Sequence, residues 1–183
     1  PVIIGESADV AKAALRIMSG KTLNAGQICL APDYVFLPEG KESEFVEAAK
    51  SAVTAMFPDG LRDNDDYTSV VNKRHLDRLN TYLQDAREKG GDVIALNPGD
   101  EDFSQQSHHK MAPHIVVNAN DDMLVMQDEI FGPILPVRTY TNVQETVAYI
   151  NKNPRPLGLY YFGSDTTERD YVLHNTTSGG VTV

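Results

Sequence analysis

Residues 33–58, Asp-Tyr-Val-Phe-Leu-Pro-Glu-Gly-Lys-Glu-Ser-Glu-Phe-Val-Glu-Ala-Ala-Lys-Ser-Ala-Val-Thr-Ala-Met-Phe-Pro, contain the pattern that decides the fold. Residues 33–37, which are mostly apolar, predict a mostly buried strand that ends at Pro38. Beyond it, apolar residues recur at helical spacing until Pro58 ends the pattern; they are Phe45, Val46, Ala49, Ala52, Val53 and Met56. A buried strand followed by an amphipathic helix is typical of an α/β protein.

The same alternation extends outward in both directions. Before this stretch, residues 2–4 predict a strand and residues 10–18 a helix. Residues 97–112 are polar and predict an exposed excursion or hairpin. Elsewhere the patterns predict helices at 76–86, 141–150 and 165–174, and strands at 92–96, 114–117, 134–140, 157–162 and 180–183. We therefore expect one α/β domain over residues 1–183, with three layers, a mostly parallel sheet and helices on both of its faces.

Several helix ends carry their own signals. Asp9 is expected to cap the first helix and Gly20 to end it. Thr141 with Gln144 resembles a capping box, in which a hydroxyl and a side chain three residues later satisfy the first free N–H groups. Asp165 is expected to cap the last helix in a similar way.

Composition excludes several classes of function. The chain has 183 residues and a net charge of −10, so nucleic acids and anionic membranes would be repelled as partners. It has no apolar run long enough to span a membrane and no signal-peptide pattern. Its single cysteine cannot form an internal disulfide and offers no thiolate cluster for zinc, so we expect no metal. One cysteine also fits a reducing, cytoplasmic setting.

That cysteine, Cys29, lies in the short polar segment 23–29 (Leu-Asn-Ala-Gly-Gln-Ile-Cys), directly after the first helix. A reactive thiol needs access and backbone donors, and a turn after a helix can supply both. A lone cysteine is more often a small buried hydrophobe. Cysteine hydrolases use a histidine base, but no local pattern links Cys29 to any histidine, and we expect all five to be surface or capping residues: His75, His108, His109, His114 and His174.

Three further features have two interpretations each. Glu129 and Phe131 precede a predicted core strand and could offer a carboxylate and an aromatic face to one ligand, or form a solvated acidic turn. Lys21 could act as an electrophilic group, or place positive charge at the end of a helix. The glycine pair at 179–180 could approach a ligand, although such glycines usually serve the turn. Residue patterns alone favour the second interpretation each time.

Two motifs together carry a family resemblance. Residues 24–29 (Asn-Ala-Gly-Gln-Ile-Cys) resemble the active-site cysteine signature of the aldehyde dehydrogenase superfamily, and residues 129–133 (Glu-Ile-Phe-Gly-Pro) resemble its nicotinamide-ribose motif, in the expected order. The similarity runs essentially from end to end. Residues 30–35 (Leu-Ala-Pro-Asp-Tyr-Val) and 155–159 (Arg-Pro-Leu-Gly-Leu) are similar to the class-3-like branch, which includes coniferyl aldehyde dehydrogenases.

The resemblance implies a mechanism. Cys29 would attack the aldehyde carbon and form a thiohemiacetal, whose oxyanion its own backbone N–H would help to hold. Hydride transfer to NAD or NADP would leave a thioester, which water hydrolyses to a carboxylic acid. Glu129 would bind the nicotinamide ribose hydroxyls, Phe131 would pack beside the nicotinamide, and Asn24 would shape the loop. The implied partners are an aldehyde and further copies of the parent, as a dimer or tetramer.

The resemblance also identifies parts of the family pattern that this chain lacks. The general-base glutamate belongs to a Glu-Leu-Gly-Gly-Lys motif that would end just before Pro1, and the oxyanion asparagine lies further upstream. The dinucleotide-binding domain and the C-terminal oligomerisation tail are absent from residues 1–183 as well. We therefore expect an excised catalytic domain with little or no turnover by itself. Two alternatives stay open: a non-catalytic scaffold with an inert thiol, and thioester acyl transfer or hydrolysis without redox chemistry.

Overall fold

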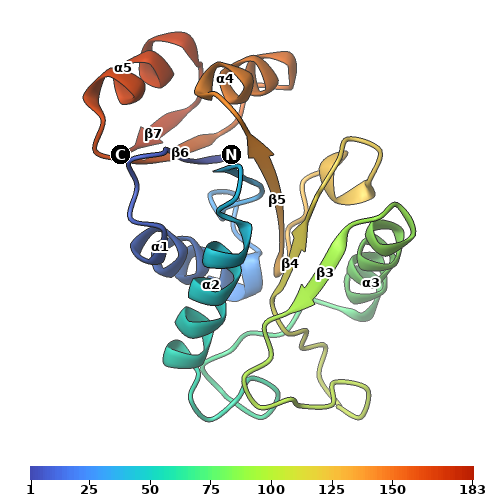
Figure 1. Ribbon diagram of the computed structural model, residues 1–183. Helices are drawn as coiled ribbons and strands as arrows, with labels where there is room; N and C mark the ends of the chain where they lie inside the picture. The colour runs from blue at the N-terminus through green and yellow to red at the C-terminus, as the bar shows by residue number, and fades with distance from the viewer.

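The computed structural model describes residues 1–183 and contains one seven-stranded sheet with the order β3-β4-β5-β2-β1-β6-β7 (Figure 1). All neighbouring strands run parallel except β3, which is antiparallel to β4 at one edge. The strands are β1 Val2–Ile4, β2 Val35–Pro38, β3 Asp92–Ala95, β4 His114–Val117, β5 Ile134–Tyr140, β6 Gly158–Phe162 and β7 Gly180–Thr182. The predicted mostly parallel sheet is confirmed.

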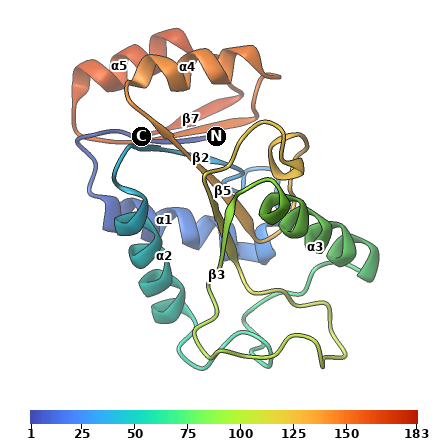
Figure 2. The same ribbon diagram turned by 45° about the vertical axis from the view of Figure 1, so that its right-hand side comes forward.

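Helices cover both faces of this sheet, so the three-layer prediction is also confirmed (Figures 1 and 2). Helices α1 (Val10–Thr22) and α2 (Glu42–Met56) pack on one face. The opposite face carries α3 (Lys73–Glu88) near β4, and α4 (Val143–Lys152) with α5 (Thr166–Asn175) near β1 and β6. None of these helices has both the length and the apolar composition needed to cross a membrane.

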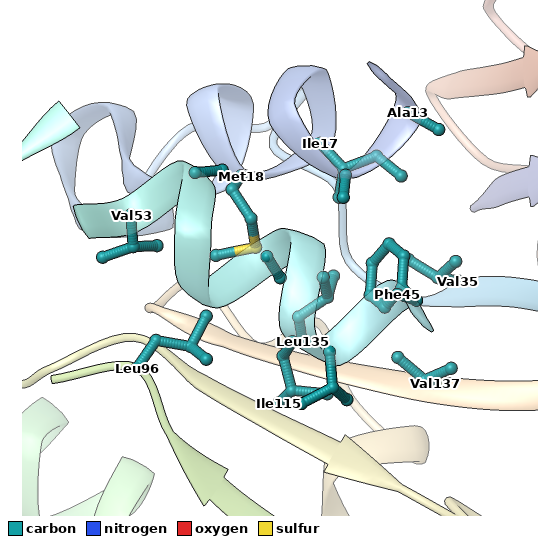
Figure 3. Packing of buried hydrophobic residues seen from close by; sticks show 14 of the residues in the cluster. Ala13, Ile17, Met18, Val35, Phe45, Val53, Leu96, Ile115, Leu135 and Val137 are labelled. Carbon is teal, nitrogen blue, oxygen red and sulfur yellow. The ribbon is translucent and has the colours of Figure 1, made fainter. Parts of the chain in front are cut away.

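The largest core lies between the sheet and the α1–α2 pair (Figure 3). Phe45 of α2 and Met18 of α1 are fully buried there. On β2, Val35 and Leu37 face this core while Phe36 faces the α4–α5 layer, and all three are buried. A strand covered on both faces must be apolar at every position, which is why Val35, Phe36 and Leu37 show no alternation of apolar and polar residues.

The predicted helix starts are largely confirmed. The Asp9 side chain accepts a hydrogen bond from the Lys12 N–H at 3.0 Å and caps α1. Asp165 caps α5 by accepting from the N–H groups of the next turn.

Two predictions about helix ends are wrong. Helix α1 continues past Gly20 to Thr22, and it ends where residues 24–26 adopt left-handed backbone angles. The capping box of α4 is shifted by one residue. Asn142 accepts from the Glu145 N–H, and the Glu145 carboxylate accepts from the Thr141 N–H at 3.1 Å. An ionised carboxylate is a stronger acceptor than the neutral amide of Gln144, so the helix starts where Glu145 can reach back.

Residues 97–112, called the 97–112 loop below, contain no strand, so the hairpin alternative is wrong. The loop is held by side chains instead. Glu101 accepts hydrogen bonds from the backbone N–H groups of Leu61 and Arg62, and Lys110 donates to backbone carbonyls of residues 61 and 64. Lys110 is only 8% exposed. This loop is therefore packed at its base rather than fully exposed.

Candidate active site

Cys29 lies in a tightly shaped loop between α1 and β2. In this Cys29 loop, residues 23–30, the φ angles of Asn24, Ala25 and Gly26 are 50°, 52° and 71°. Such angles are costly for side chains other than glycine, so the loop needs contacts that hold it. The Gln27 side chain supplies some of them, since it donates to the carbonyls of Asn24 and Ser69 at 3.0 Å. The thiol of Cys29 is exposed, as chemistry requires and as a buried structural cysteine would not be.

The Cys29 loop rests directly on residues 129–133, called the Glu129 loop below. A Cβ atom on Gly26 would lie 2.4 Å from the carbonyl oxygen of Gly132, closer than any real contact. A Cβ atom on Gly132 would in turn lie 2.6 Å from the side chain of Leu79 in α3. Glycine in both motifs therefore lets two backbones touch. This contact joins the two motifs that the sequence places far apart.

Two charged side chains hold the Glu129 loop at Ile130. The Asp33 carboxylate accepts a hydrogen bond from the Ile130 N–H at 3.2 Å, and the Arg78 guanidinium donates to the Ile130 carbonyl at 2.5 Å. Arg78 also lies over the ring of Tyr82, 4.9 Å from its centre. Sequence reasoning missed both residues as parts of the site. Asp33 stands in a segment that resembles the class-3-like branch, which was a signal, whereas nothing in the sequence singled out Arg78.

Cys29 and Glu129 line one cavity of about 510 Å³. Its walls are partly aromatic, with Tyr34, Tyr149 and Tyr160 among the lining residues. The structure thus brings two of the three predicted site residues together. Phe131 does not line this cavity; its side chain is 41% exposed and its φ angle is 48°.

Tyr160 of β6 also fixes the end of the Cys29 loop. Its hydroxyl donates to the carbonyl of Leu30, the residue after the cysteine, at 2.6 Å. Burial raises the pKa of Tyr160, and the neighbouring Cys29 raises it further. The phenol is therefore neutral at physiological pH and able to donate this hydrogen bond.

Lys21 is buried rather than displayed at the end of α1. Its side chain is 1% exposed, and its Nζ has no hydrogen-bond partner. Burial lowers the pKa of Lys21 to about 8, while the charges of Asp33 and Glu129 act in the opposite direction. Lys21 does lie in the last turn of α1, as the sequence predicted, but the sequence did not predict its burial.

None of the five histidines lines the cavity. His114 begins β4, where burial lowers its pKa to about 4, and its Nδ1 lies 2.7 Å from the Ala112 carbonyl. His174 makes a similar contact with the Asp170 carbonyl near the end of α5. No group of three or more histidine, cysteine or carboxylate side chains is arranged to hold a metal ion. The polar groups of the cavity could instead be used to bind a hydroxyl-bearing ligand, because the exposed residue Glu129 lines the same cavity as Cys29.

Comparison with known proteins identifies the family to which the sequence is similar. The sequence matches the family described as "Aldehyde dehydrogenase family" over residues 1–183. It is 56% identical over 183 residues to a probable coniferyl aldehyde dehydrogenase of Caulobacter vibrioides, and 51% identical to a coniferyl aldehyde dehydrogenase of a Pseudomonas species. Each alignment covers 100% of this chain and 38% of the relative. The chain therefore spans well under half the length of these relatives.

A solved structure gives the same result for the fold. The substrate-bound state of Staphylococcus aureus AldH superposes with a TM-score of 0.89 at 31% sequence identity. The match covers 100% of this chain and 38% of that one.

Proposed function

The chain belongs to the aldehyde dehydrogenase family, and we propose that it forms the cysteine-bearing catalytic domain of an NAD(P)-dependent enzyme that oxidises an aldehyde to a carboxylic acid. One observation carries this proposal: the exposed thiol of Cys29 and the exposed carboxylate of Glu129 line the same cavity. An aldehyde and a cofactor that bind in this cavity would therefore contact a nucleophile and a hydroxyl-binding carboxylate.

Cys29 is the nucleophile of the proposed reaction. Its sulfur bonds to the aldehyde carbon, and the carbonyl oxygen becomes the oxyanion of a thiohemiacetal. The backbone N–H of Cys29 donates to no acceptor within the protein, so it is free to stabilise that oxyanion. After loss of a hydride the adduct is a thioester, and water then releases the carboxylic acid and restores the thiol.

The residues near Cys29 fit a nicotinamide cofactor. NAD or NADP, when bound, supplies the acceptor for the hydride. The Glu129 carboxylate would accept hydrogen bonds from the ribose hydroxyls, and the exposed ring of Phe131 would pack beside the nicotinamide. Asp33 and Arg78 support this role indirectly, because they fix the backbone next to Glu129.

The substrate that we propose is an aromatic aldehyde such as coniferyl aldehyde. Two relatives bear that name, and three tyrosines line the cavity: Tyr34, Tyr149 and Tyr160. Aromatic rings give such a pocket favourable stacking surfaces. We further propose that the full-length protein is cytoplasmic and works as a homodimer or homotetramer.

Kinetics of the full-length protein test this function. With coniferyl aldehyde and NAD or NADP, formation of reduced cofactor should accompany formation of the acid, and C29S should lower kcat by at least ~10³-fold. E129Q should chiefly raise the KM for the cofactor. S19A on α1 is the control and should change neither.

Two outcomes would favour the alternatives. Acid release from a thioester without any cofactor would indicate acyl transfer or hydrolysis. A Cys29 thiol that iodoacetamide does not modify would indicate an inert scaffold.

A further inference from the structure

Cys29 stands in a reverse turn of its own. The Ala31 N–H donates to the Ile28 carbonyl at 2.9 Å, so residues 28–31 form a hydrogen-bonded turn with the cysteine at its second position. This bond fixes the shape of the turn, but it does not fix where the turn lies relative to the rest of the protein. The place of the thiol therefore depends on the contacts made on either side of it.

Gln27 attaches the N-terminal side of this turn to the segment before α3. Its side-chain carbonyl accepts a hydrogen bond from the Val71 N–H at 2.9 Å, and its Nε2 donates to the Ser69 carbonyl at 3.0 Å. Nε2 also donates to the Asn24 carbonyl at 3.0 Å. A primary amide has two N–H donors and one carbonyl, so both ends of this side chain are bonded to backbone groups. Two of the three partners lie 42 and 44 positions later in the chain.

Tyr160 of β6 attaches the C-terminal side of the turn to the sheet. Its hydroxyl donates to the carbonyl of Leu30, the third residue of the turn, at 2.6 Å. The strand packs closely there, since a Cβ atom on Gly158 would lie 3.0 Å from the Leu30 side chain. Strand β6 is paired with β1 inside the sheet, which makes it a firm support. The turn is thus held from two different parts of the fold.

These two side chains act on the backbone of the loop rather than on the thiol. Gln27 does not line the cavity, and the Tyr160 hydroxyl is bonded to the Leu30 carbonyl. A displacement of about 1 Å between reacting atoms can slow a reaction about 100-fold, even when its cause lies away from the chemistry. Hydrogen bonds that fix the backbone beside a nucleophile can therefore control its rate.

We propose that Gln27 and Tyr160 are positioning residues for the nucleophile: their hydrogen bonds hold the backbone on both sides of Cys29 and keep its thiol where it attacks the aldehyde. This inference rests on the proposed function, in which Cys29 is that nucleophile. Gln27 acts through residues 24–28, and the Tyr160 hydroxyl acts through the Leu30 carbonyl.

Single-turnover kinetics of the full-length protein test this role. The enzyme is held in saturating excess over coniferyl aldehyde, and formation of reduced cofactor is followed. Under this condition the rate constant does not depend on how much of the enzyme is folded, so a merely structural role would not change it. Q27M removes all three bonds of the amide and should lower the rate constant about 100-fold. Y160F keeps the ring, loses one hydroxyl and should lower it about tenfold. The dissociation constant for the cofactor should stay unchanged in both.

Two bonds of the same kind elsewhere in the chain provide matched controls. The Gln106 amide donates to the Lys110 carbonyl at 2.8 Å and accepts from the Lys110 N–H at 2.9 Å. The Tyr140 hydroxyl donates to the Ile4 carbonyl at 2.8 Å. None of these residues lines the cavity. Q106M and Y140F should therefore lower the unfolding temperature, as loss of such bonds does, and keep the wild-type rate constant.

The outcomes separate this inference from the proposed function. Q27M or Y160F with the wild-type rate constant would overturn the inference, and so would controls that are slowed to the same extent. If Q27M does not fold, Y160F decides, because it changes a single oxygen atom. C29S identifies the other failure. If C29S abolishes the reaction while Q27M and Y160F do not slow it, Cys29 keeps its role and the inference alone is wrong. If the wild type forms no reduced cofactor, the proposed function is wrong and the inference falls with it.

Discussion

Two lysines are almost fully buried in this protein, and they differ in what surrounds their charge. Lys110, at the end of the 97–112 loop, donates to the carbonyls of Leu61 and Asn64 at 3.3 and 2.5 Å. The ammonium of Lys21, in the last turn of α1, has no hydrogen-bond partner. The first ammonium joins two loops and stabilises the fold, since each carbonyl gains a charged donor. The second has no hydrogen-bond partner, so its burial costs stability. Burial alone therefore does not tell whether a charged residue stabilises the fold.

The loops around the two lysines differ in the same way. The 97–112 loop is fixed by side chains that bond to backbone groups, and its one non-glycine residue with a left-handed φ angle is Asp100, at 47°. The Cys29 loop contains three consecutive left-handed residues, and its backbone lies directly on the Glu129 loop. Strain and close backbone contact concentrate where we place the chemistry.

The glycine contact between the two site loops offers the largest expected effect. G26A should lower the free energy of unfolding by about 3 kcal/mol, because alanine is strained at this φ and its Cβ would overlap the Gly132 carbonyl. G40A is the matched control: Gly40 also has a positive φ of 82°, but nothing lies within 4 Å of a Cβ there. It should lose only about 1 kcal/mol. Urea denaturation measures both, and equal losses would contradict a specific contact.

Methionine at each buried lysine tests the comparison directly. K110M should lower the free energy of unfolding by about 2 kcal/mol, because two carbonyls lose their shared donor inside the protein. K21M should leave it unchanged or raise it, since a buried charge without a partner disappears. The advantage of K21M over wild type should shrink as the pH rises from 8 to 10.5. In this range Lys21 is neutral in the folded wild-type protein, so folding no longer buries a charge. Denaturation at pH 7 and pH 10 measures this difference, and a K21M that is less stable than K110M would refute the distinction.

Protonation of His114 should have a smaller effect on folding stability, and its pKa determines the direction of that effect. Its pKa is lowered from 6.5 to about 4 in the folded state, so the unfolded chain binds more protons between these values. Stability should therefore be intact above pH 6.5 and fall by about 2 kcal/mol as the pH drops toward 4. H114N cannot gain this proton, yet its amide can still donate to the Ala112 carbonyl. Between pH 7 and pH 4, the free energy of unfolding should therefore fall less in H114N than in wild type. If it falls equally in both proteins, groups other than His114 cause the loss.

An exposed lysine should give the smallest change in the free energy of unfolding. Lys73 lies 2.6 Å from Asp77 on α3, with 75% of its side chain exposed. K73M should change the free energy of unfolding by no more than about 0.5 kcal/mol, because solvent screens such a pair. Thermal or urea denaturation of K73M and K110M under the same conditions checks this. A loss comparable to that of K110M would mean that burial is not what separates the two lysines.

The sequence was informative wherever one strong local signal determined the structure. The apolar run of β2 and the helical spacing of α2 predicted the α/β layers, and Asp9 predicted the start of α1. Helix ends were less predictable. Gly20 is followed by two more helical residues, because the chain turns only where residues 24–26 can rest on the Glu129 loop. That reason lies in a distant segment, so no local pattern could reveal it.

The sequence predicted the motifs of the site but not the residues that hold those motifs in place. Cys29 and Glu129 were singled out before the structure brought them to one cavity, whereas Phe131 lies outside that cavity. Arg78 stands on an ordinary polar helix, and only the fold places it against the Ile130 carbonyl. Lys21 was noticed and assigned to the helix end, because burial of a charge cannot be read from its neighbours in the sequence.

The hydrogen bond between Asp33 and Ile130 joins residues 97 positions apart. Contacts of such long range form late in folding, because the chain between them must be ordered first. On a ribosome, the cysteine therefore emerges well before the segment that will shape its surroundings. During that interval the nascent chain carries Cys29 without the Glu129 loop, which in the folded protein packs directly against the Cys29 loop.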